Sequence, residues 1–226
     1  MKIVIVNPNS TDSMTRKCAE AARKVAGKNT EIYSTNPSTS PASIQGYYDV
    51  AQATVPMLQE INAEPDADAY IIACFDDSGL DAARCITDKP VIGIGEAAFH
   101  MASIISCRFS VVTTLRRSVP GIEANLKSYG LHERCVKVRA SEIPVLELES
   151  GNPATMERLY LTINKAIEHD GAEAIVLGCA GMVDLLQELT TKFSLPFVDG
   201  VTSAVCLAEA LVKTGLRTSK VGGYAR

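Results

Sequence analysis

The chain carries the sequence YIIACFDDSG at residues 70–79 and the related sequence AIVLGCAG at residues 174–181. In both, a short apolar run ends in a cysteine, Cys74 in the first and Cys179 in the second, and the chain then turns through small or acidic residues. An uninterrupted apolar run of this length, followed by turn residues, predicts a strand that is buried on both faces. Each cysteine is therefore expected at the carboxyl end of a strand, where open α/β sheets bind their ligands.

The rest of the chain repeats this pattern. Apolar segments alternate with helical ones, which predicts parallel sheets covered by helices. Three landmarks recur after nearly the same interval: Cys74 and Cys179 are 105 positions apart, Pro90 and Pro196 are 106, and Val4 and Val111 are 107. We predict an α/β fold of two pseudo-twofold-related lobes, each a mainly parallel sheet flanked by helices, with the active site in the cleft between them. The first lobe comprises residues 1–96 and 206–226, with the C-terminal helix crossing back to cover it, and the second comprises residues 97–205.

The same patterns predict the individual elements. Strands are expected at residues 3–6, 31–34, 69–73, 90–94, 108–114, 135–138, 174–177 and 196–200. Helices are expected at residues 13–25, 47–62, 80–86, 96–106, 119–129, 153–170, 183–193 and 201–214. Residues 36–46 and 143–152 are expected to be irregular, residues 217–226 to form a docked or loose tail, and Pro56 to kink its helix or divide it.

Composition narrows the class of protein. Of the 226 residues, 46% are hydrophobic and 21% are charged, as in globular proteins that bury a core. The net charge of -4 gives no attraction to nucleic acid or to anionic membranes. No apolar run approaches the roughly 18 residues of a membrane span. The apolar run at the N-terminus is also too short, before polar residues begin, for a signal peptide. We expect a cytoplasmic protein with neither nucleic-acid nor membrane partners.

The 7 cysteines include no CxxC pair. In a reducing compartment most should be thiols, and neither a disulfide framework nor a metal site is expected. A single cysteine after an apolar strand is more often a small core residue than a reactive one, and only the repeat sets one pair apart. The others are assigned to packing: Cys18, Cys85, Cys107, Cys135 and Cys206.

Two thiols at equivalent places on facing lobes suit proton transfer on opposite sides of one carbon. A thiolate removes an acidic C–H proton next to a carbonyl, and the opposite thiol returns a proton from the other face. This two-base chemistry needs neither metal nor organic cofactor. Cys74 and Cys179 are therefore the candidate catalytic residues.

Backbone amides after each cysteine are candidates for stabilising negative charge. Those of Ala180 and Gly181 lie where a helix is expected to start, and those of Ser78 and Gly79 follow the first thiol.

Asp76 and Asp77 oppose thiolate formation if they point inward, because like charges repel. Alternatively, one of the two aspartates caps the helix that follows or accepts hydrogen bonds from ligand N–H groups.

The loops that follow the first strand of each lobe should reach the same edge as the thiols. In the first lobe this loop, NPNST at residues 7–11, contains Asn9 and Ser10 and either lines the site or caps a helix. Thr113 and Thr114 are its counterparts in the second lobe, with hydroxyls and amides that suit a ligand carbonyl.

Several segments resemble one known family. They are NPNST at 7–11, SPASI at 40–44, ACFDD at 73–77, FSVVTT at 109–114, and residues 170–182 around GCAGM. They span nearly the whole chain in order. By these segments the chain resembles the aspartate/glutamate/hydantoin racemase superfamily, and within it the hydantoin and allantoin racemases.

The resemblance implies two lobes with the active site between them, and it implies that Cys74 and Cys179 are the acid/base pair. It further implies a cofactor-independent homo-oligomer. The substrate-binding residues predicted on this basis are Asn9, Ser10, Asp76, Ser78, Gly79, Thr113, Thr114, Gly178, Ala180 and Gly181.

Departures from the family's other branches favour a cyclic ureide substrate. Glutamate racemases carry Asp-Ser-Gly after the first strand and Cys-Thr-His at the second thiol, whereas this chain has Asn-Pro-Asn at 7–9 and Cys-Ala-Gly at 179–181. A neutral hydantoin ring, with an already acidified C5–H, needs less recognition than a free amino acid. Arylmalonate decarboxylases keep only one of the two thiols, so the presence of both favours racemisation.

The leading hypothesis is therefore racemisation of 5-substituted hydantoins at C5, with allantoin as the alternative substrate. Two further hypotheses are a non-catalytic two-lobed protein that binds small molecules and a decarboxylase or cis–trans isomerase that uses one thiol. Tyr47 and Tyr48 either line a side-chain pocket or begin a helix. The enantiomer on which each cysteine acts is left open.

Overall fold

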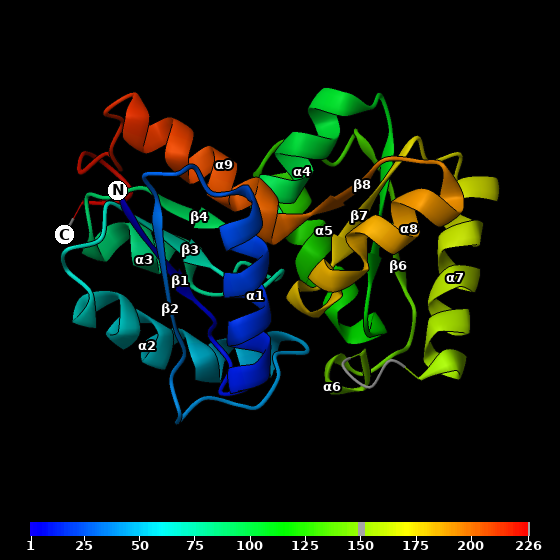
Figure 1. Ribbon diagram of the computed structural model, residues 1–226, viewed down its shortest axis with the longest axis horizontal. Coiled ribbons are helices and arrows are strands. Elements are labelled where there is room, and N and C mark those ends of the chain that lie inside the picture. The colour runs from blue at the N-terminus through cyan, green and yellow to red at the C-terminus, as the bar shows by residue number, and fades with distance from the viewer. Residues whose placement is uncertain (149–151, 226) are drawn as a thin grey trace.

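Strands of the two halves form separate sheets of identical topology. The computed structural model describes residues 1–148 and 152–225, and in it each lobe contains a four-stranded parallel sheet (Figure 1). The first sheet has the order β2-β1-β3-β4, and the second has the equivalent order β6-β5-β7-β8. The strands are β1 (Lys2–Val6), β2 (Glu31–Thr35), β3 (Ala69–Ile72), β4 (Val91–Gly93), β5 (Phe109–Thr113), β6 (Cys135–Ala140), β7 (Ala174–Gly178) and β8 (Phe197–Asp199). The predicted two-lobed α/β fold is confirmed.

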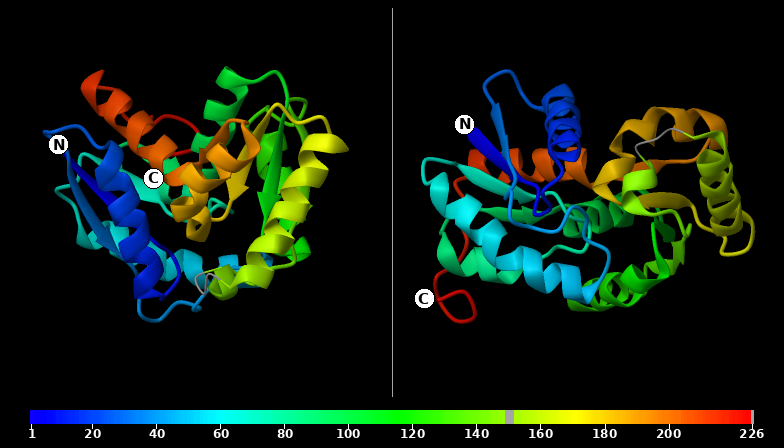
Figure 2. Two further views of the ribbon diagram at one scale, coloured as in Figure 1. Left: turned by 45° about the vertical axis from the view of Figure 1, so that its right-hand side comes forward. Right: turned by 90° about the horizontal axis from the view of Figure 1, so that it is seen from below.

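Helices flank both sheets, and the two lobes lie side by side (Figure 2). The α-helices are α1 (Asp12–Val25), α2 (Tyr47–Ala63), α3 (Leu80–Ile86), α4 (Ile94–Ile105), α5 (Val119–Ser128), α6 (Val145–Leu148), α7 (Pro153–Glu168), α8 (Leu186–Phe193) and α9 (Gly200–Lys213). Two 3-10 helices precede α5 and α8: η1 (Arg116–Ser118) and η2 (Ala180–Leu185).

The structure corrects three details of the predicted elements. Pro56 lies inside a single helix, α2, and does not divide it, and Met57 and Ile61, which follow Pro56, are buried in the first lobe's core. The segment 143–152 was expected to be irregular, but it contains α6, whose Val145 and Leu148 are buried; residues 149–151 lie outside the described residues. The helix expected from 183 begins earlier, at Ala180, as 3-10 helix η2.

Strand register brings the candidate loops to one edge of each sheet. Val6 pairs with Ile72 at the ends of β1 and β3, and Thr113 pairs with Gly178 at the ends of β5 and β7. All residues of β3 and β7 are buried, as their apolar sequences predict.

Helices α4 and α9 exchange lobes. α4 follows β4 but contacts β7 and β8 of the second sheet, while α9 follows β8 but contacts β3, β4 and α1. The two helices also pack on each other across the junction (Figure 1). Their approach is closest at Gly200, where an added Cβ would lie 2.3 Å from the Ile94 carbonyl oxygen. The lobe limits at residues 96 and 206 stay a prediction.

One apolar core runs beneath the junction. Phe99 of α4 packs on Phe75 of the first thiol segment and on Phe109 of β5, with ring centroids 5.3 and 6.2 Å away. Ile71 of β3 and Val176 of β7 belong to the same buried cluster. Because the core is shared, the carboxyl edges of the two sheets are held in a fixed relation.

The C-terminal tail is docked on the first lobe. Arg217 forms an ion pair with Asp88, and the Lys220 ammonium donates to the carbonyls of Arg84 and Cys85 at the end of α3. Across the described residues, no helix is long and apolar enough to cross a bilayer.

Candidate active site

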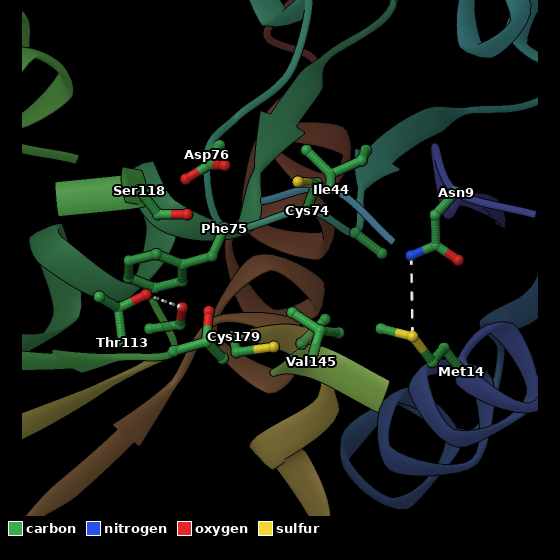
Figure 3. Close-up of a pocket in the computed structure, with 14 residues that line it drawn as sticks. Asn9, Met14, Ile44, Cys74, Phe75, Asp76, Thr113, Ser118, Val145 and Cys179 are labelled. Atoms are coloured by element: carbon green, nitrogen blue, oxygen red, sulfur yellow. Dashed lines mark hydrogen bonds between the residues drawn. The ribbon is translucent and has the colours of Figure 1, made fainter. Parts of the chain in front are cut away.

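Both thiols line one cavity between the lobes. The cavity holds about 380 Å³ of space between protein atoms, part of it open to solvent, and Cys74 and Cys179 lie on different walls (Figure 3). Ala73 directly precedes Cys74 and is tied to β1 by its amide, which donates to the Val6 carbonyl at 2.9 Å. Cys179 directly follows β7 and is the N-cap residue of η2. The carboxyl edges of the two sheets thus place both thiols in the same space.

Some of the predicted binding residues line this cavity and others do not. Those that line it are Asn9, Asp76, Thr113, Thr114, Gly178 and Ala180. Ser78 and Gly79 line an adjoining cavity, while Ser10 and Gly181 are absent from both linings. Gly181 lies close to the second thiol, since a Cβ there would be 3.6 Å from Cys179 Sγ.

The cavity also includes residues that the sequence did not single out. They are Met14, Ile44, Phe75, Ser118 and Val145. Ile44 and Phe75 belong to matched family segments, which was a usable signal. Met14, Ser118 and Val145 come from helices α1, η1 and α6, and no local pattern marks them.

The loop after β1 is held by its own asparagines. Asn7 Nδ2 donates to Asn9 Oδ1 at 3.0 Å and to Thr15 Oγ1 at 2.9 Å, and the Thr11 amide donates to Asn9 Oδ1 at 2.9 Å. The N-cap of α1, Thr11, makes no side-chain capping bond. Asn9 thus uses its oxygen to shape the loop, and its amide nitrogen, 3.8 Å from Met14 Sδ, remains a donor for the cavity.

Thr113 is committed to the sheet. Its hydroxyl donates to the Gly178 carbonyl at 2.9 Å and so fastens β5 to β7 beside Cys179. The Thr114 carbonyl accepts the Glu142 amide at 2.8 Å. Both threonines are buried and shape the cavity wall.

Asp77 caps α4. Its carboxylate accepts the amides of Gly95 at 2.9 Å and Glu96 at 2.8 Å, and the Tyr129 hydroxyl at 2.8 Å. Burial raises the pKa of Asp77 to about 7, against the lowering effect of these hydrogen bonds. The helix that it caps is α4, 18 residues along the chain, rather than the helix that follows it.

Asp76 faces the cavity instead. Its half-buried side chain lines both the thiol cavity and the adjoining one. Burial raises its pKa to about 7, and the nearby charge of Asp49 contributes. Asp76 is therefore the carboxyl group that faces both cavities.

The Cys74 thiol is held in its protonated form. Burial and the charge of Asp76 raise the pKa of Cys74 well above its ordinary value, and the Ser78 hydroxyl, 3.3 Å from the sulfur, acts in the opposite sense. These effects together favour the thiol form of Cys74 over its thiolate.

The remaining cysteines differ in exposure. Cys18 is fully buried, which raises its pKa to about 12. Cys85 and Cys135 are half-buried. Cys107 and Cys206 are exposed, so their assignment to packing is wrong.

A second cavity adjoins the first and shares Asp76 and Ser118 with it. It holds about 620 Å³ of space between protein atoms, part of it open to solvent. Its walls are the first turn of α2, with Tyr47 and Val50, and the face of α5. Tyr47 both begins a helix and lines a pocket, whereas Tyr48 is 75% exposed. Residues 1–148 and 152–225 contain no group of three or more His, Cys, Asp or Glu side chains that could hold a metal.

Comparisons with known proteins agree with this architecture. Residues 3–208 match the family model described as Asp/Glu/Hydantoin racemase. The chain is similar to a hydantoin racemase of Rhizobium meliloti, with 51% identity over 100% of this chain and 94% of that protein.

Solved structures give the same result. The fold is similar to that of allantoin racemase from Klebsiella pneumoniae, with a TM-score of 0.96 and 43% identity over 100% of this chain and 93% of that one. A glutamate racemase from Campylobacter jejuni subsp. jejuni, 17% identical over 95% of this chain and 86% of that one, shares the fold with a TM-score of 0.65. The chain therefore belongs to the Asp/Glu/hydantoin racemase family and is an isomerase of the racemase class.

Proposed function

We propose that this racemase inverts C5 of 5-substituted hydantoins by proton transfer between Cys74 and Cys179, without a metal or an organic cofactor. The observation that carries the proposal is the placement of the two thiols on different walls of one cavity between the lobes. The similarity to named hydantoin and allantoin racemases supports the substrate class.

The reaction uses one thiolate and one thiol. The thiolate removes the C5 proton, and the electron pair moves into the ring to give an enolate-like oxyanion on the neighbouring carbonyl. The opposite thiol then donates its proton to the other face of C5, which leaves the two sulfurs with exchanged protonation states. Solvent exchange resets them. In the reverse direction the two sulfurs exchange roles, so each thiol is the base for one enantiomer and the acid for the other.

The cavity suits a neutral ring. Asp76 is the only Asp, Glu, Lys or Arg side chain among the described residues that line it, so nothing there pairs with an amino-acid carboxylate. The Asp76 carboxyl accepts a ring N–H, and Asn9 Nδ2 donates to a ring carbonyl. Backbone amides at the start of η2 stabilise the oxyanion.

The C5 substituent extends into the adjoining cavity beyond Asp76 and Ser118. Val50, Gly121 and Ala124 give this cavity an apolar side, which suits alkyl and aryl substituents. The Asn125 amide on the same wall offers polar contacts for a ureido group. Allantoin, which is 5-ureidohydantoin, is thus the alternative substrate.

Assembly and location are proposed on the family resemblance. A homo-oligomer is expected, and analytical ultracentrifugation of the purified chain tests this. A cytoplasmic location is tested by fractionation of cells that express the chain.

Two substitutions test the mechanism against the other hypotheses. Cys74→Ser and Cys179→Ser should each lower racemisation by more than about 10³-fold, because each removes one of two acid/base groups. Each variant should still exchange the C5 proton of one enantiomer in heavy water, because one thiol remains. Cys107→Ser, an exposed thiol outside the cavity, is the control.

Different outcomes identify different functions. If both serine variants racemise the substrate at the wild-type rate, the two-thiol mechanism is wrong. A dispensable cysteine points to a single-thiol decarboxylase or isomerase. Ligand binding with no turnover by the native protein points to a non-catalytic binding protein.

A further inference from the structure

We propose that Asp77 is a positioning residue for Cys74: it fastens the loop that carries this thiol to the start of α4 and to the opposite lobe. The inference rests on the proposed function, because it assumes that the position of Cys74 matters for proton transfer.

The contacts of Asp77 connect three parts of the molecule. The Asp77 amide donates to the Cys74 carbonyl at 3.0 Å, so the two residues form one tight turn. The Asp77 carboxylate accepts the amides of Gly95 and Glu96, the second and third residues of α4. The Tyr129 hydroxyl, directly after α5 in the second lobe, donates to the same carboxylate. The residue that anchors α4 and Tyr129 is therefore joined through one turn to the residue that carries the thiol.

The space around this carboxylate is shaped for it. An added Cβ at Gly93 would lie 2.1 Å from Asp77 Oδ1, and one at Gly95 would lie 2.8 Å from Oδ2. Asp77 itself adopts a positive φ of 49°, a conformation that non-glycine residues rarely adopt. Such a conformation persists where the surrounding contacts fix it, and these hydrogen bonds supply the fixation.

In the second lobe the equivalent helix, α9, is capped by the residue directly before it rather than from the Cys179 loop. By the interval of the repeat, Met182 occupies the place of Asp77, and Asp199 occupies that of Gly93. Asp199 caps its own helix, α9, by accepting the Thr202 amide at 2.9 Å. Of these two helices, α4 is thus capped from the Cys74 loop and α9 by its own aspartate, so a cap alone does not require the long-range contact.

This difference between the lobes supplies the decisive variant. Asp77→Ala removes the cap and the tether together, whereas Asp77→Ala/Gly93→Asp replaces the cap with a local one, as in the second lobe. Gly93 has the extended backbone (φ -81°, ψ 140°) that an N-cap aspartate adopts. The double variant should regain most of the thermal stability that Asp77→Ala loses, but not its activity.

Two readouts follow Cys74 itself. The first is alkylation of each cysteine by iodoacetamide, mapped by mass spectrometry of peptides. The double variant should change the alkylation rate of Cys74 by about tenfold or more and leave that of Cys179 within about threefold. This measurement requires no assumption about the reaction.

The second readout is exchange of the C5 proton in heavy water. Racemisation should fall by about 10²-fold, as expected when a reacting group is displaced by about an ångström. Exchange of the enantiomer that the Cys74→Ser variant still exchanges should persist, because that exchange depends on Cys179.

A matched control tests for a general effect of losing a carboxylate. Glu173 also accepts two successive backbone amides, those of Cys107 and Arg108, but lies at the opposite end of β7 from Cys179. Glu173→Gln should leave both readouts within about threefold of wild type, whereas Asp77→Asn should change both.

The outcomes separate the two proposals. An unchanged alkylation rate of Cys74 in the folded double variant overturns the positioning role, whatever the reaction is. A changed alkylation rate with undiminished racemisation instead overturns the proposed function, because a displaced Cys74 would then be irrelevant to turnover. Equal losses in Glu173→Gln and Asp77→Asn also overturn the positioning role.

Discussion

The two thiol segments have the same place in the fold but different attachments. Cys74 lies in a loop that Asp77 ties to α4 and to Tyr129. Cys179 begins a 3-10 helix of its own chain segment, and the helix that follows β8 is capped locally by Asp199. The first thiol loop is therefore held by a carboxylate that reaches α4 and the opposite lobe, whereas the second thiol follows a strand end that the Thr113 hydroxyl fastens and begins a 3-10 helix. An internal repeat thus preserves the position of a reactive group while each copy holds it differently.

Among changes that leave both thiols in place, the largest expected effect comes from crowding the first attachment. Gly93→Ala places a methyl group 2.1 Å from Asp77 Oδ1 and forces the carboxylate away from α4. We expect kcat to fall about 10²-fold because Cys74 moves with Asp77. Steady-state polarimetry measures this, with Gly223→Ala as a control whose added Cβ meets nothing within 4 Å. Wild-type kcat in a folded Gly93→Ala variant would show that the thiol loop is not rigidly attached.

The second effect concerns the junction rather than either thiol. Gly200→Ala places a Cβ 2.3 Å from the Ile94 carbonyl oxygen, a backbone atom that cannot turn aside. Overpacking at this crossing of α4 and α9 should lower the free energy of unfolding by about 1–3 kcal/mol. Urea denaturation measures the change. A loss below about 0.5 kcal/mol would contradict the close contact of the exchanged helices.

A third prediction concerns the cavity that borders only the first thiol segment. Val50→Phe fills part of this cavity. The kcat/KM for 5-benzylhydantoin should therefore fall about tenfold relative to that for 5-methylhydantoin. Val55→Phe is the matched control, because Val55 lies on the same helix and is 61% exposed. Equal effects on the two substrates would place the C5 substituent elsewhere.

The fourth prediction uses the Ser78 hydroxyl, which lies 3.3 Å from the Cys74 sulfur. The Ser78 hydroxyl stabilises the Cys74 thiolate, so Ser78→Ala should raise the pKa of Cys74 further. In a Cys179→Ser background, C5 exchange reports Cys74 alone, and its rise with pH should move upward by about one pH unit. At neutral pH the exchange rate should fall about tenfold. A shift toward lower pH would reverse the assigned role of the hydroxyl.

The smallest effect distinguishes how the two exchanged helices are fastened. Glu209 of α9 accepts the Thr30 hydroxyl, the Lys213 ammonium and the Gly27 amide, and these contacts lower its pKa to about 2. Because the folded pKa lies below the ordinary value of 4.5, this contribution is complete above pH 4.5 and is lost as the pH falls toward 2.

Glu209→Gln should therefore lower the free energy of unfolding at neutral pH by about 1 kcal/mol. The variant should also show a smaller fall in melting temperature between pH 4.5 and 2, which thermal unfolding at a series of pH values measures. In α4 the corresponding attachment is Arg134, whose guanidinium donates to the carbonyls of Ser103 and Ser106 and does not titrate in this range. If the melting temperature of Glu209→Gln falls between pH 4.5 and 2 as steeply as that of the wild type, other carboxylates cause the loss of stability in acid.

Local sequence was enough to predict the parts of the site that lie on strands. β3 and β7 are continuous apolar runs, and the cysteines that follow them had to emerge at a sheet edge. The equal intervals of the repeat predicted that both thiols would occupy equivalent places. Asn9 and Thr113 were predicted for the same reason, since β1 and β5 end beside β3 and β7.

The parts that escaped prediction depend on contacts between segments far apart in the chain. Asp77 meets α4 only because Gly93 and Gly95 leave room for its carboxylate. Met14 and Val145 enter the cavity from helices that approach it across the junction. The Thr113 hydroxyl was expected to hold a ligand, but it is occupied by the Gly178 carbonyl of the neighbouring strand.

The sequence by itself determined the order of strands and helices, the duplication, and the pair of cysteines at the ends of two buried strands. Periodicity and apolar runs are sufficient for this, because burial of strands and helices is a local property of the chain. Only the tertiary structure decided which groups surround each thiol. Whether a carboxylate faces a sulfur or a helix end depends on which segments the shared core brings together. Asp76 faces the cavity, whereas Asp77, its neighbour in sequence, caps a helix 18 residues along the chain.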